Sequence, residues 1–498
     1  MRLLESILII FSILLLIHLF SQRLTKLTGA VVSAASGVIL FMQLMMEGYR
    51  WQMLFVYCIT VISINLIMRR RRKITVQPKS RRKRIQGTIC YSLMAGLIFI
   101  SMLLAVYLPV FNLPIPDGPS KVGTQTLYYK DESRDEIFTD DLADKRELMM
   151  QVWYPAQKTE ENDKSALFPE DKKVFKKLIA AYSESLHLPA FVLDYWRYIK
   201  SNAYEDAEIQ ASVTPYPIIL LNHGMGTSRL LHASQAESLA SHGYVVVAID
   251  HTYNSAATVF PDGHVTRFNT DLMDTDQNTS NNVQLDTWIQ DVEFVLKQIR
   301  QLNTGLPTSR FTGKLDMNNI GIMGHSFGGA TAFKAYYTIP ELKAGINMDG
   351  SLFNLDTSHE ITKPFMFIES GEYYMAKENG DKKLSEQELQ KMNLTRDEYN
   401  RIIDNVHKEN RIMDQVAQHG GTMIYVKGTA HYNFTDFQFY SRLLKLMGMT
   451  GEIDGSRGAY IANQYILDFF DKHLKGTHGQ LLNGPSPDFP EVEFPKFH

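Results

Sequence analysis

Four long apolar runs fill the first part of the chain. They cover residues 3–20, 28–46, 51–68 and 88–110 and carry almost no charged side chains. A helix rises about 1.5 Å per residue, so about 20 residues cross a hydrocarbon core about 30 Å thick. Core helices of a soluble protein are the alternative, but they normally keep a polar face, which these runs lack. The pattern therefore predicts four transmembrane helices within residues 1–112.

The loops between these runs predict how the helices are oriented. The connection at residues 69–84 holds ten Lys and Arg side chains, and loops of this kind stay on the cytoplasmic side. The amino terminus and everything after the fourth run are then outside the cell. No small-x-small cleavage site follows the first run, which argues against a cleaved signal peptide. We therefore expect a multi-pass protein of the cell membrane, with Glu5 reaching toward the interface.

Short apolar and β-branched runs alternate with helical patterns in the rest of the chain. Eight runs have the length and composition of strands: residues 124–129, 148–154, 217–221, 244–249, 320–323, 345–348, 364–368 and 422–426. Residues 285–299 carry apolar side chains at steps of three and four, which predicts an amphipathic helix. This alternation favours an α/β fold, with a mostly parallel sheet covered by helices on both faces.

The same pattern divides the chain into domains. The Pro- and Gly-rich segment LPIPDGPS opens a linker at residues 113–123, which separates the transmembrane region from an α/β domain at 124–475 and a tail at 476–498. Two stretches, at about 158–212 and 374–416, interrupt the alternation and are candidate lids or lipid-facing surfaces. The first is aromatic and includes Tyr195 and Trp196; for the second, surface helices packed on the sheet are the alternative.

The transmembrane region and the rest of the chain carry opposite net charges, which the formal net charge of -3 for the whole chain conceals. Residues 1–112 hold 14 Lys and Arg against two Glu, a net of +12, whereas the remainder holds 37 basic against 52 acidic residues, a net of -15. The basic loop lacks interleaved aromatic residues, so we expect anionic lipid headgroups, and no nucleic acid, as its neighbours. The two cysteines, Cys58 and Cys90, exclude a disulfide scaffold and a Cys-based structural zinc site.

One motif carries the first candidate for chemistry. Residues 324–328 read GHSFG, which fits G-x-S-x-G, with the strand-like NNIGIMG before it and the helix former GATAFKAYY after it. In this context the glycines permit a strained turn that lifts the Ser326 hydroxyl above the sheet edge, at the start of a helix. The motif therefore predicts a nucleophilic serine at Ser326.

A serine nucleophile needs a base, and the base needs an acid that orients it. His431 follows the last predicted strand and so lies at the same sheet edge as Ser326, whereas the other downstream histidines lie in inserts, before strands or in and after the last helix. Asp349 ends the strand-like run AGINMDG and is the favoured acid. Glu369 and Glu372, after the next strand, are the alternatives.

The strand-like run PIILLNHG leads into a candidate oxyanion loop, GMG, at residues 224–226. α/β-Hydrolases donate one oxyanion N–H from this position and a second from the residue after the nucleophile. We therefore expect the backbone amides of Met225 and Phe327 to form the oxyanion hole. His223 is expected to shape the loop through a hydrogen bond to its backbone, and His325 to pack under the turn.

Together these segments resemble the platelet-activating factor acetylhydrolase family of the plasma, lipoprotein-associated type. The resemblance spans roughly residues 113–475 and rests on HGMGTSRLLHASQAESLASHGYVVVAIDHTYNSA from His223, GHSFGGAT from Gly324, NMDGSLF from Asn347, KPFMFIESGEYY from Lys363 and GTAHYNFTDF from Gly428. It implies an α/β-hydrolase fold, with Ser326, Asp349 and His431 as nucleophile, acid and base and with the Met225 and Phe327 amides as oxyanion donors. The resemblance thus favours Asp349 as the acid.

The family resemblance also implies a reaction. Members of this family hydrolyse short or oxidised acyl groups from the middle position of glycerophospholipids, without calcium or any other cofactor. The four predicted spans have no counterpart in the secreted members, so we expect a membrane-anchored serine ester hydrolase with a lipid or small ester as its substrate. The alternatives are a general carboxylesterase, a polyester hydrolase, or a non-catalytic membrane receptor or scaffold with an esterase-like domain.

Overall fold

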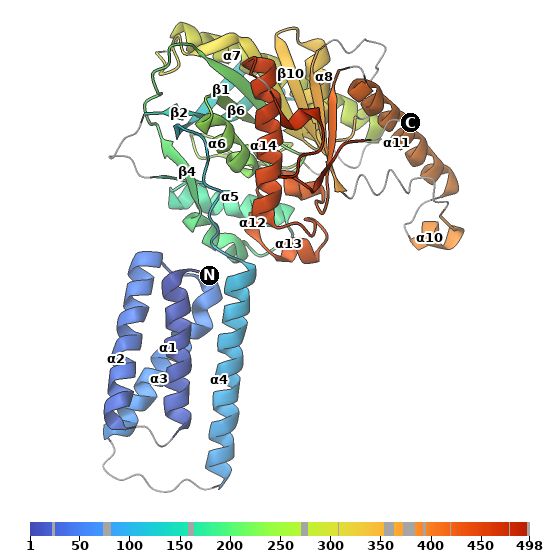
Figure 1. The fold of residues 1–498 in the computed structure, drawn as a ribbon. Helices are drawn as coiled ribbons and strands as arrows, with labels where there is room; N and C mark the ends of the chain where they lie inside the picture. The colour runs from blue at the N-terminus through green and yellow to red at the C-terminus, as the bar shows by residue number, and fades with distance from the viewer. Residues whose placement is uncertain are drawn as a thin grey trace. The chain divides into compact units, whose positions relative to one another are not determined.

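The computed structural model of the chain describes two compact units, both drawn in Figure 1. The helical unit consists of Met1–Phe111, Pro189–Tyr198 and Tyr440–Leu443, and the sheet unit consists of Asn112–Leu188, Ile199–Phe439 and Leu444–His498. The structure describes all residues except 22–24, 73–80, 158–163, 270–276, 307, 353–362, 372–383, 392–394, 419, 478 and 496–498. Half of the predicted basic loop and Glu372 therefore lie outside the described residues.

Four helices make up most of the helical unit. They are α1 (Leu3–Phe20), α2 (Lys26–Met42, continued by the π-helical turn Gln43–Glu47), α3 (Leu54–Arg72, preceded by the 3-10 turn Trp51–Met53) and α4 (Arg81–Tyr107). All four are long and apolar enough to cross a membrane, judged by length and composition. They coincide with the four predicted apolar runs, and apolar side chains such as Leu8, Val56 and Ile98 form their common core.

A buried ion pair joins the start of α1 to the segment before α3. Glu5 Oε2 lies 2.9 Å from Arg50 Nη1, and both side chains are fully buried. Arg2 adds a second contact, with its Nη2 2.7 Å from Glu5 Oε1. The expectation that Glu5 extends to the interface is therefore wrong. Its carboxylate turns inward because two guanidinium groups can neutralise it there.

The aromatic stretch of the first insert also belongs to the helical unit. Its 3-10 helix, Ala190–Tyr198, buries Tyr195 and Trp196, which are 2% and 3% exposed. The Tyr195 ring lies 5.6 Å from the Arg50 guanidinium carbon, and the Tyr198 hydroxyl donates to the Tyr49 carbonyl oxygen at 2.7 Å. These two rings are therefore packing groups, and the interpretation of Tyr195 and Trp196 as a lipid-facing surface is wrong.

A mixed sheet forms the centre of the sheet unit. Its eleven strands among the described residues follow the order β13-β12-β11-β10-β9-β5-β6-β2-β1-β4-β3. The six from β12 to β6 run parallel, whereas β2 pairs antiparallel with both β6 and β1. The strands are β1 (Lys121–Asp135), β2 (Lys145–Ala156), β3 (Lys164–Ala166), β4 (Lys200–Glu205), β5 (Tyr216–Asn222), β6 (Val245–Asp250), β9 (Leu315–His325), β10 (Leu342–Met348), β11 (Phe365–Ser370), β12 (Thr422–Val426) and β13 (Val492–Glu493), with a separate hairpin of β7 (Ala257–Val259) and β8 (Val265–Arg267). All eight predicted strands are confirmed.

Helices cover both faces of this sheet, as Figure 1 shows. On one face, α7 (Gln277–Thr304), α8 (Phe327–Thr338) and α11 (Arg396–Gln418) bury apolar side chains against the strands. On the other face lie α6 (Ala233–Ser241) and α14 (Gly455–Leu474); a Cβ on Gly321 of β9 would stand 2.6 Å from the Phe470 ring of α14. The described part of the second insert, α11, is thus a surface helix packed on the sheet.

The remaining described helices are short, apart from α5. They are α5 (Lys172–Ser185), α10 (Glu386–Lys391), α12 (Phe437–Tyr440) and α13 (Leu443–Leu446), with 3-10 turns at Arg229–His232, His431–Phe434 and Leu481–Asn483. Because β5, β9, β10, β11 and β12 are parallel neighbours, the loops that follow them meet at one edge of the sheet. This edge carries all the predicted site residues.

The Glu5–Arg50 pair predicts the outcome of a substitution. Arg50→Met should lower the free energy of unfolding by about 3 kcal/mol, because the buried carboxylate loses its closest fully buried partner. Unfolding of the detergent-solubilised chain with increasing dodecyl sulfate, followed by circular dichroism, measures this change.

Two further variants make this test specific. Arg69→Met removes an exposed arginine from the end of α3 and should leave stability unchanged within about 0.5 kcal/mol. Glu5→Leu combined with Arg50→Met should recover most of the lost stability, since the buried charge is then gone. Equal stability of the Arg50→Met and Arg69→Met variants would contradict the importance of the pair.

Candidate active site

The turn at Ser326 has a conformation that few residues adopt. Ser326 lies between β9 and α8 with φ 56° and ψ -122°. A Cβ on Gly324 would stand 2.0 Å from the Gly328 carbonyl oxygen, and one on Gly328 would stand 2.3 Å from the carbonyl oxygen of Asn222. Both approaches are closer than any real carbon tolerates, so only glycine fits on either side of the serine. The strained turn holds the hydroxyl at the start of α8.

Asp349 and His431 are hydrogen-bonded to each other. His431 Nδ1 lies 2.8 Å from Asp349 Oδ2, and the Ser370 N–H donates to Asp349 Oδ1 at 2.7 Å. A ring nitrogen facing a carboxylate carries the proton, so Nε2 of the neutral imidazole keeps its lone pair. The Asp349 side chain is 7% exposed and the His431 side chain 39%, so the candidate acid is shielded while the candidate base is open to solvent.

Strand register brings Asp349 next to the serine. Met348 of β10 pairs with His325 of β9, and the Ser326 N–H donates to the Met348 carbonyl oxygen at 3.0 Å. Among the described contacts, none is a hydrogen bond between Ser326 Oγ and His431, and contacts of this kind often tighten only when substrate binds. Glu369, the alternative acid, is fully buried within β11.

His325 has a role that the sequence did not reveal. Its Nε2 lies 2.9 Å from the carbonyl oxygen of His431, and the two rings are 4.5 Å apart. Burial first, and then the charge that His431 can carry, lower the pKa of His325 well below its ordinary value, so its ring is neutral. His325 therefore fixes the backbone that carries the candidate base. The sequence offered one hint of this role, a histidine inside the G-x-S-x-G motif. A histidine at this position is equally consistent with packing alone.

The candidate oxyanion loop follows β5. Here the Gly226 N–H donates to the Asn254 carbonyl oxygen at 2.8 Å, and the Thr227 N–H donates to that of Gly224 at 3.0 Å. The structure records no acceptor for the Met225 N–H among the residues it describes. The side chains of Met225 and Phe327 pack in one cluster around Trp288. Packing thus draws together the two residues whose amides were predicted to form the oxyanion hole.

The described residues include no candidate metal site. Within the part of the chain that the structure describes, there is no group of three or more His, Cys, Asp or Glu side chains arranged to hold a metal ion. Cys58 and Cys90 are free thiols on exposed faces of α3 and α4.

Another buried histidine, His232, lies next to His325. It is fully buried, and its Nδ1 lies 2.8 Å from Gln235 Oε1. Its ring lies 5.9 Å from that of His325. Burial lowers the pKa of His232 from 6.5 to about 4, with the Gln235 contact opposing the shift. Below pH 6.5 the unfolded chain therefore binds a proton that the folded chain takes up only near pH 4.

This difference predicts the pH dependence of stability. As the pH falls from 6.5 to 4, His232 should remove about 3 kcal/mol from the free energy of unfolding, and His232→Asn should abolish this part of the loss. Asparagine places an amide donor where Nδ1 stands. Denaturant titrations at several pH values measure the slope, with exposed His187→Asn as the control. Identical slopes for wild type and His232→Asn would overturn the assignment.

Comparisons with known proteins show which family this chain resembles. A family model described as platelet-activating factor acetylhydrolase, isoform II, matches residues 109–483. A platelet-activating factor acetylhydrolase of Cavia porcellus is 25% identical over 388 residues, which cover 73% of this chain and 78% of that protein. A probable 1-alkyl-2-acetylglycerophosphocholine esterase of Arthroderma benhamiae is 26% identical over 438 residues, which cover 82% of this chain and 99% of that protein.

A solved structure supports the fold. A ferulic acid esterase from Streptomyces cinnamoneus matches with a TM-score of 0.60 at 24% sequence identity, covering 78% of this chain and 100% of its own. The mixed sheet with helices on both faces fits the expected α/β-hydrolase fold. Relatives named as esterases leave the alternative of a non-catalytic receptor without support. Since the family model matches more than half of this chain, the chain belongs to the platelet-activating factor acetylhydrolase, isoform II, family and is a carboxylic ester hydrolase.

Proposed function

We propose that the chain is a membrane-anchored serine ester hydrolase that removes short or oxidised acyl groups from the sn-2 position of phospholipids. The observation that carries this proposal is the Asp349–His431 hydrogen bond beside the strained turn at Ser326. A nucleophile on such a turn, a base and a shielded acid are the parts that acyl transfer through a serine ester needs.

The proposed mechanism starts with His431 as general base. Its Nε2 takes the Ser326 proton while Oγ attacks the ester carbonyl, and Asp349 stabilises the imidazolium that forms. The Met225 and Phe327 amides donate to the oxyanion of the tetrahedral intermediate. The imidazolium then protonates the departing alkoxide, which leaves an acyl-serine. His431 then deprotonates a water molecule, whose oxygen attacks the acyl carbonyl carbon. The bond between that carbon and Ser326 Oγ breaks while the imidazolium returns the proton to Oγ, and the released carboxylic acid loses its own proton to solvent.

The substrate class is supported by the relatives. Two of them are named as an acetylhydrolase of platelet-activating factor and a 1-alkyl-2-acetylglycerophosphocholine esterase, and the second aligns over nearly its whole length. Helices that hold an enzyme at a bilayer keep it where amphiphilic lipids are concentrated. A general carboxylesterase or polyester hydrolase uses the same chemistry on soluble or polymeric esters and is the second candidate.

The test combines an active-site probe with a substrate panel. A fluorophosphonate probe should label wild type at Ser326, and Ser326→Ala should lose labelling and about 10⁴-fold or more of the esterase activity. Ser456→Ala, at an exposed helix position, is the matched control and should keep both. The panel compares phosphatidylcholine vesicles with a truncated or a long sn-2 chain and a soluble p-nitrophenyl ester.

The panel separates the candidate substrates. Hydrolysis of the truncated phosphatidylcholine well above that of the long-chain lipid supports the phospholipid proposal. Turnover of the p-nitrophenyl ester with none of the truncated lipid would favour the carboxylesterase instead. An active enzyme that the probe does not label at Ser326 would refute the proposed nucleophile.

The proposed membrane topology rests on the four apolar helices and on the charges between them. The Arg side chains at the end of α3 and the start of α4 belong to the predicted basic loop, which would remain in the cytoplasm. The amino terminus and the sheet unit would then be outside, in a multi-pass protein of the cell membrane. Anionic lipid headgroups are the proposed neighbours of the loop.

Single cysteines test this topology. In a full-length chain with Cys58→Ser and Cys90→Ser, an impermeant maleimide should label Ser456→Cys in intact cells. It should label Arg82→Cys only after permeabilisation. The opposite pattern would invert the topology, and labelling of both sites in intact cells would exclude a cytoplasmic loop at this position.

A further inference from the structure

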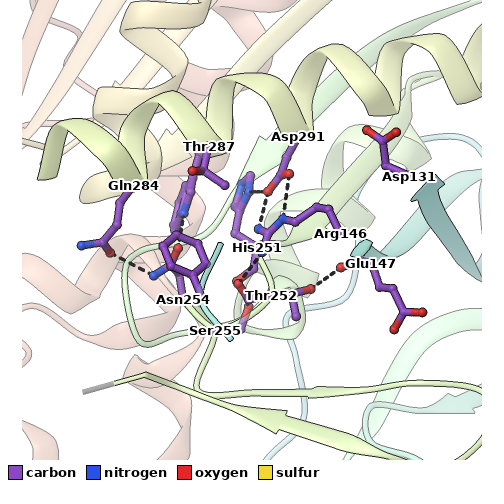
Figure 2. A network of polar contacts seen from close by, with 12 residues as sticks. Asp131, Arg146, Glu147, His251, Thr252, Asn254, Ser255, Gln284, Thr287 and Asp291 are labelled. Carbon is purple, nitrogen blue, oxygen red and sulfur yellow. Dashed lines mark hydrogen bonds and ion pairs between the residues drawn. The ribbon is translucent and has the colours of Figure 1, made fainter. Parts of the chain in front are cut away.

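We infer that Asp291 of α7 is a positioning residue for the oxyanion hole, and that it acts through His251 and the loop after β6. This inference rests on the proposed function of the same site. Asp291 is fully buried and lies in the network of polar contacts drawn in Figure 2.

The oxyanion loop is bonded to the loop after β6 on both sides of Met225. On one side His223 Nδ1 lies 2.7 Å from the Gly224 carbonyl oxygen, so Nδ1 carries the proton and Nε2 accepts. The backbone N–H of His251 then donates to His223 Nε2 at 3.1 Å. On the other side the Gly226 N–H donates to the Asn254 carbonyl oxygen at 2.8 Å. The loop after β6 thus sets the backbone around Met225.

His223 must be neutral for this arrangement to hold. Burial, and then the neighbouring His251, lower the pKa of His223 well below its ordinary value. The Ser255 hydroxyl also lies 2.8 Å from its Nε2 and can donate to it. His223 is therefore an acceptor for two groups of the loop after β6, which ties its orientation to that loop.

One face of α7 holds the loop after β6. Asp291 Oδ2 lies 2.9 Å from His251 Nδ1, and the Trp288 Nε1–H donates to Asn254 Oδ1 at 2.8 Å. Gln284 Oε1 accepts from Asn254 Nδ2 at 2.9 Å. Residues three and four apart share a face of a helix, so all three contacts come from a single face of α7. Figure 2 shows Gln284 and Asp291 reaching from this helix toward Asn254 and His251.

Asp291 itself is held by Arg146 of β2. Arg146 Nε and Nη2 lie 3.0 and 2.6 Å from the two carboxylate oxygens, a bidentate pair. Arg146 Nη1 also donates to the Thr252 carbonyl oxygen at 2.9 Å, next to His251. Burial alone would raise the pKa of Asp291, but the charge of Arg146 and the bonds from Arg146 and His251 bring it below its ordinary value. The carboxylate therefore stays charged and fixed.

The same helix also touches the second proposed donor. The Trp288 ring stacks on that of His251 at 3.8 Å and meets the Phe327 ring edge-on at 4.9 Å. The separation of the Met225 and Phe327 amides is therefore set from one face of α7. Packing alone does not require charges here, because apolar side chains would fill the same volume without the cost of burying ions. Charge-assisted hydrogen bonds are shorter and stronger than neutral ones, which suits a contact that fixes a loop.

The test uses the full-length enzyme in detergent with a short p-nitrophenyl ester and a trifluoromethyl ketone, which forms a tetrahedral adduct on serine. Asp291→Asn should lower kcat about 10- to 100-fold and weaken the inhibitor by a similar factor, with KM within about twofold. The acid limb of the pH profile should stay in place, because Asp349 and His431 are untouched.

The matched control is Asp286→Asn, the same substitution on the same helix at an exposed aspartate paired with Lys334. It should resemble wild type in every readout. Trp288→Phe is the second variant; it keeps an aromatic ring against His251 but loses the bond to Asn254, and it should change kcat and inhibitor affinity in the same direction.

The outcomes separate the inference from the function on which it rests. If wild type neither hydrolyses esters nor reacts at Ser326, the proposed function fails. If wild type is active and Asp291→Asn keeps its kcat and inhibitor affinity, or changes KM alone, only the positioning role is wrong. If the Asp291→Asn variant does not fold, the kcat and inhibitor affinity of Trp288→Phe test the positioning role instead. If neither variant folds, the network is purely structural and the positioning role is wrong.

Discussion

The site depends on one steric constraint, which is the contact of backbone against backbone around Ser326. The turn from β9 into α8 leaves no room for a side chain at Gly324 or Gly328, because each faces a carbonyl oxygen at a distance that a Cβ cannot occupy. This close packing places the start of α8 against the end of β5, where the oxyanion loop begins. The candidate nucleophile, both proposed oxyanion donors and the strand that carries the candidate acid therefore take their positions from a single crowded turn.

Each unit also contains a buried ion pair that links segments distant in the chain. Glu5 and Arg50 join the start of α1 to the segment before α3, and Arg146 and Asp291 join strand β2 to helix α7. Removing such charges from water is costly, and the cost is tolerable only with short, directional contacts. Removing one partner leaves an uncompensated buried charge, so each pair opposes the separation of the two segments that it joins.

The sequence predicted the sheet well because buried parallel strands are nearly continuous apolar runs. It predicted the places of Ser326, Asp349 and His431 because strand ends are visible in such a pattern. Five strands were not predicted, because they are too short or too polar to show a clear apolar pattern: β3, β4, β7, β8 and β13. The Asp291–His251–Arg146 network was not predictable, because Arg146 and Asp291 are 145 residues apart. Glu5 was misjudged for the same reason, since its partner lies 45 residues away.

The depth of the Arg146–Asp291 pair has a consequence for the conditions in which the enzyme can work. Dissolved ions weaken attraction between exposed charges beyond about 8 Å at physiological salt, but they do not enter the space between two groups sealed from solvent. The acidic surface of residues 113–498, with a net charge of -15, responds to the surrounding electrolyte. The network behind the candidate oxyanion loop is buried away from that electrolyte, so its geometry should change little with ionic strength.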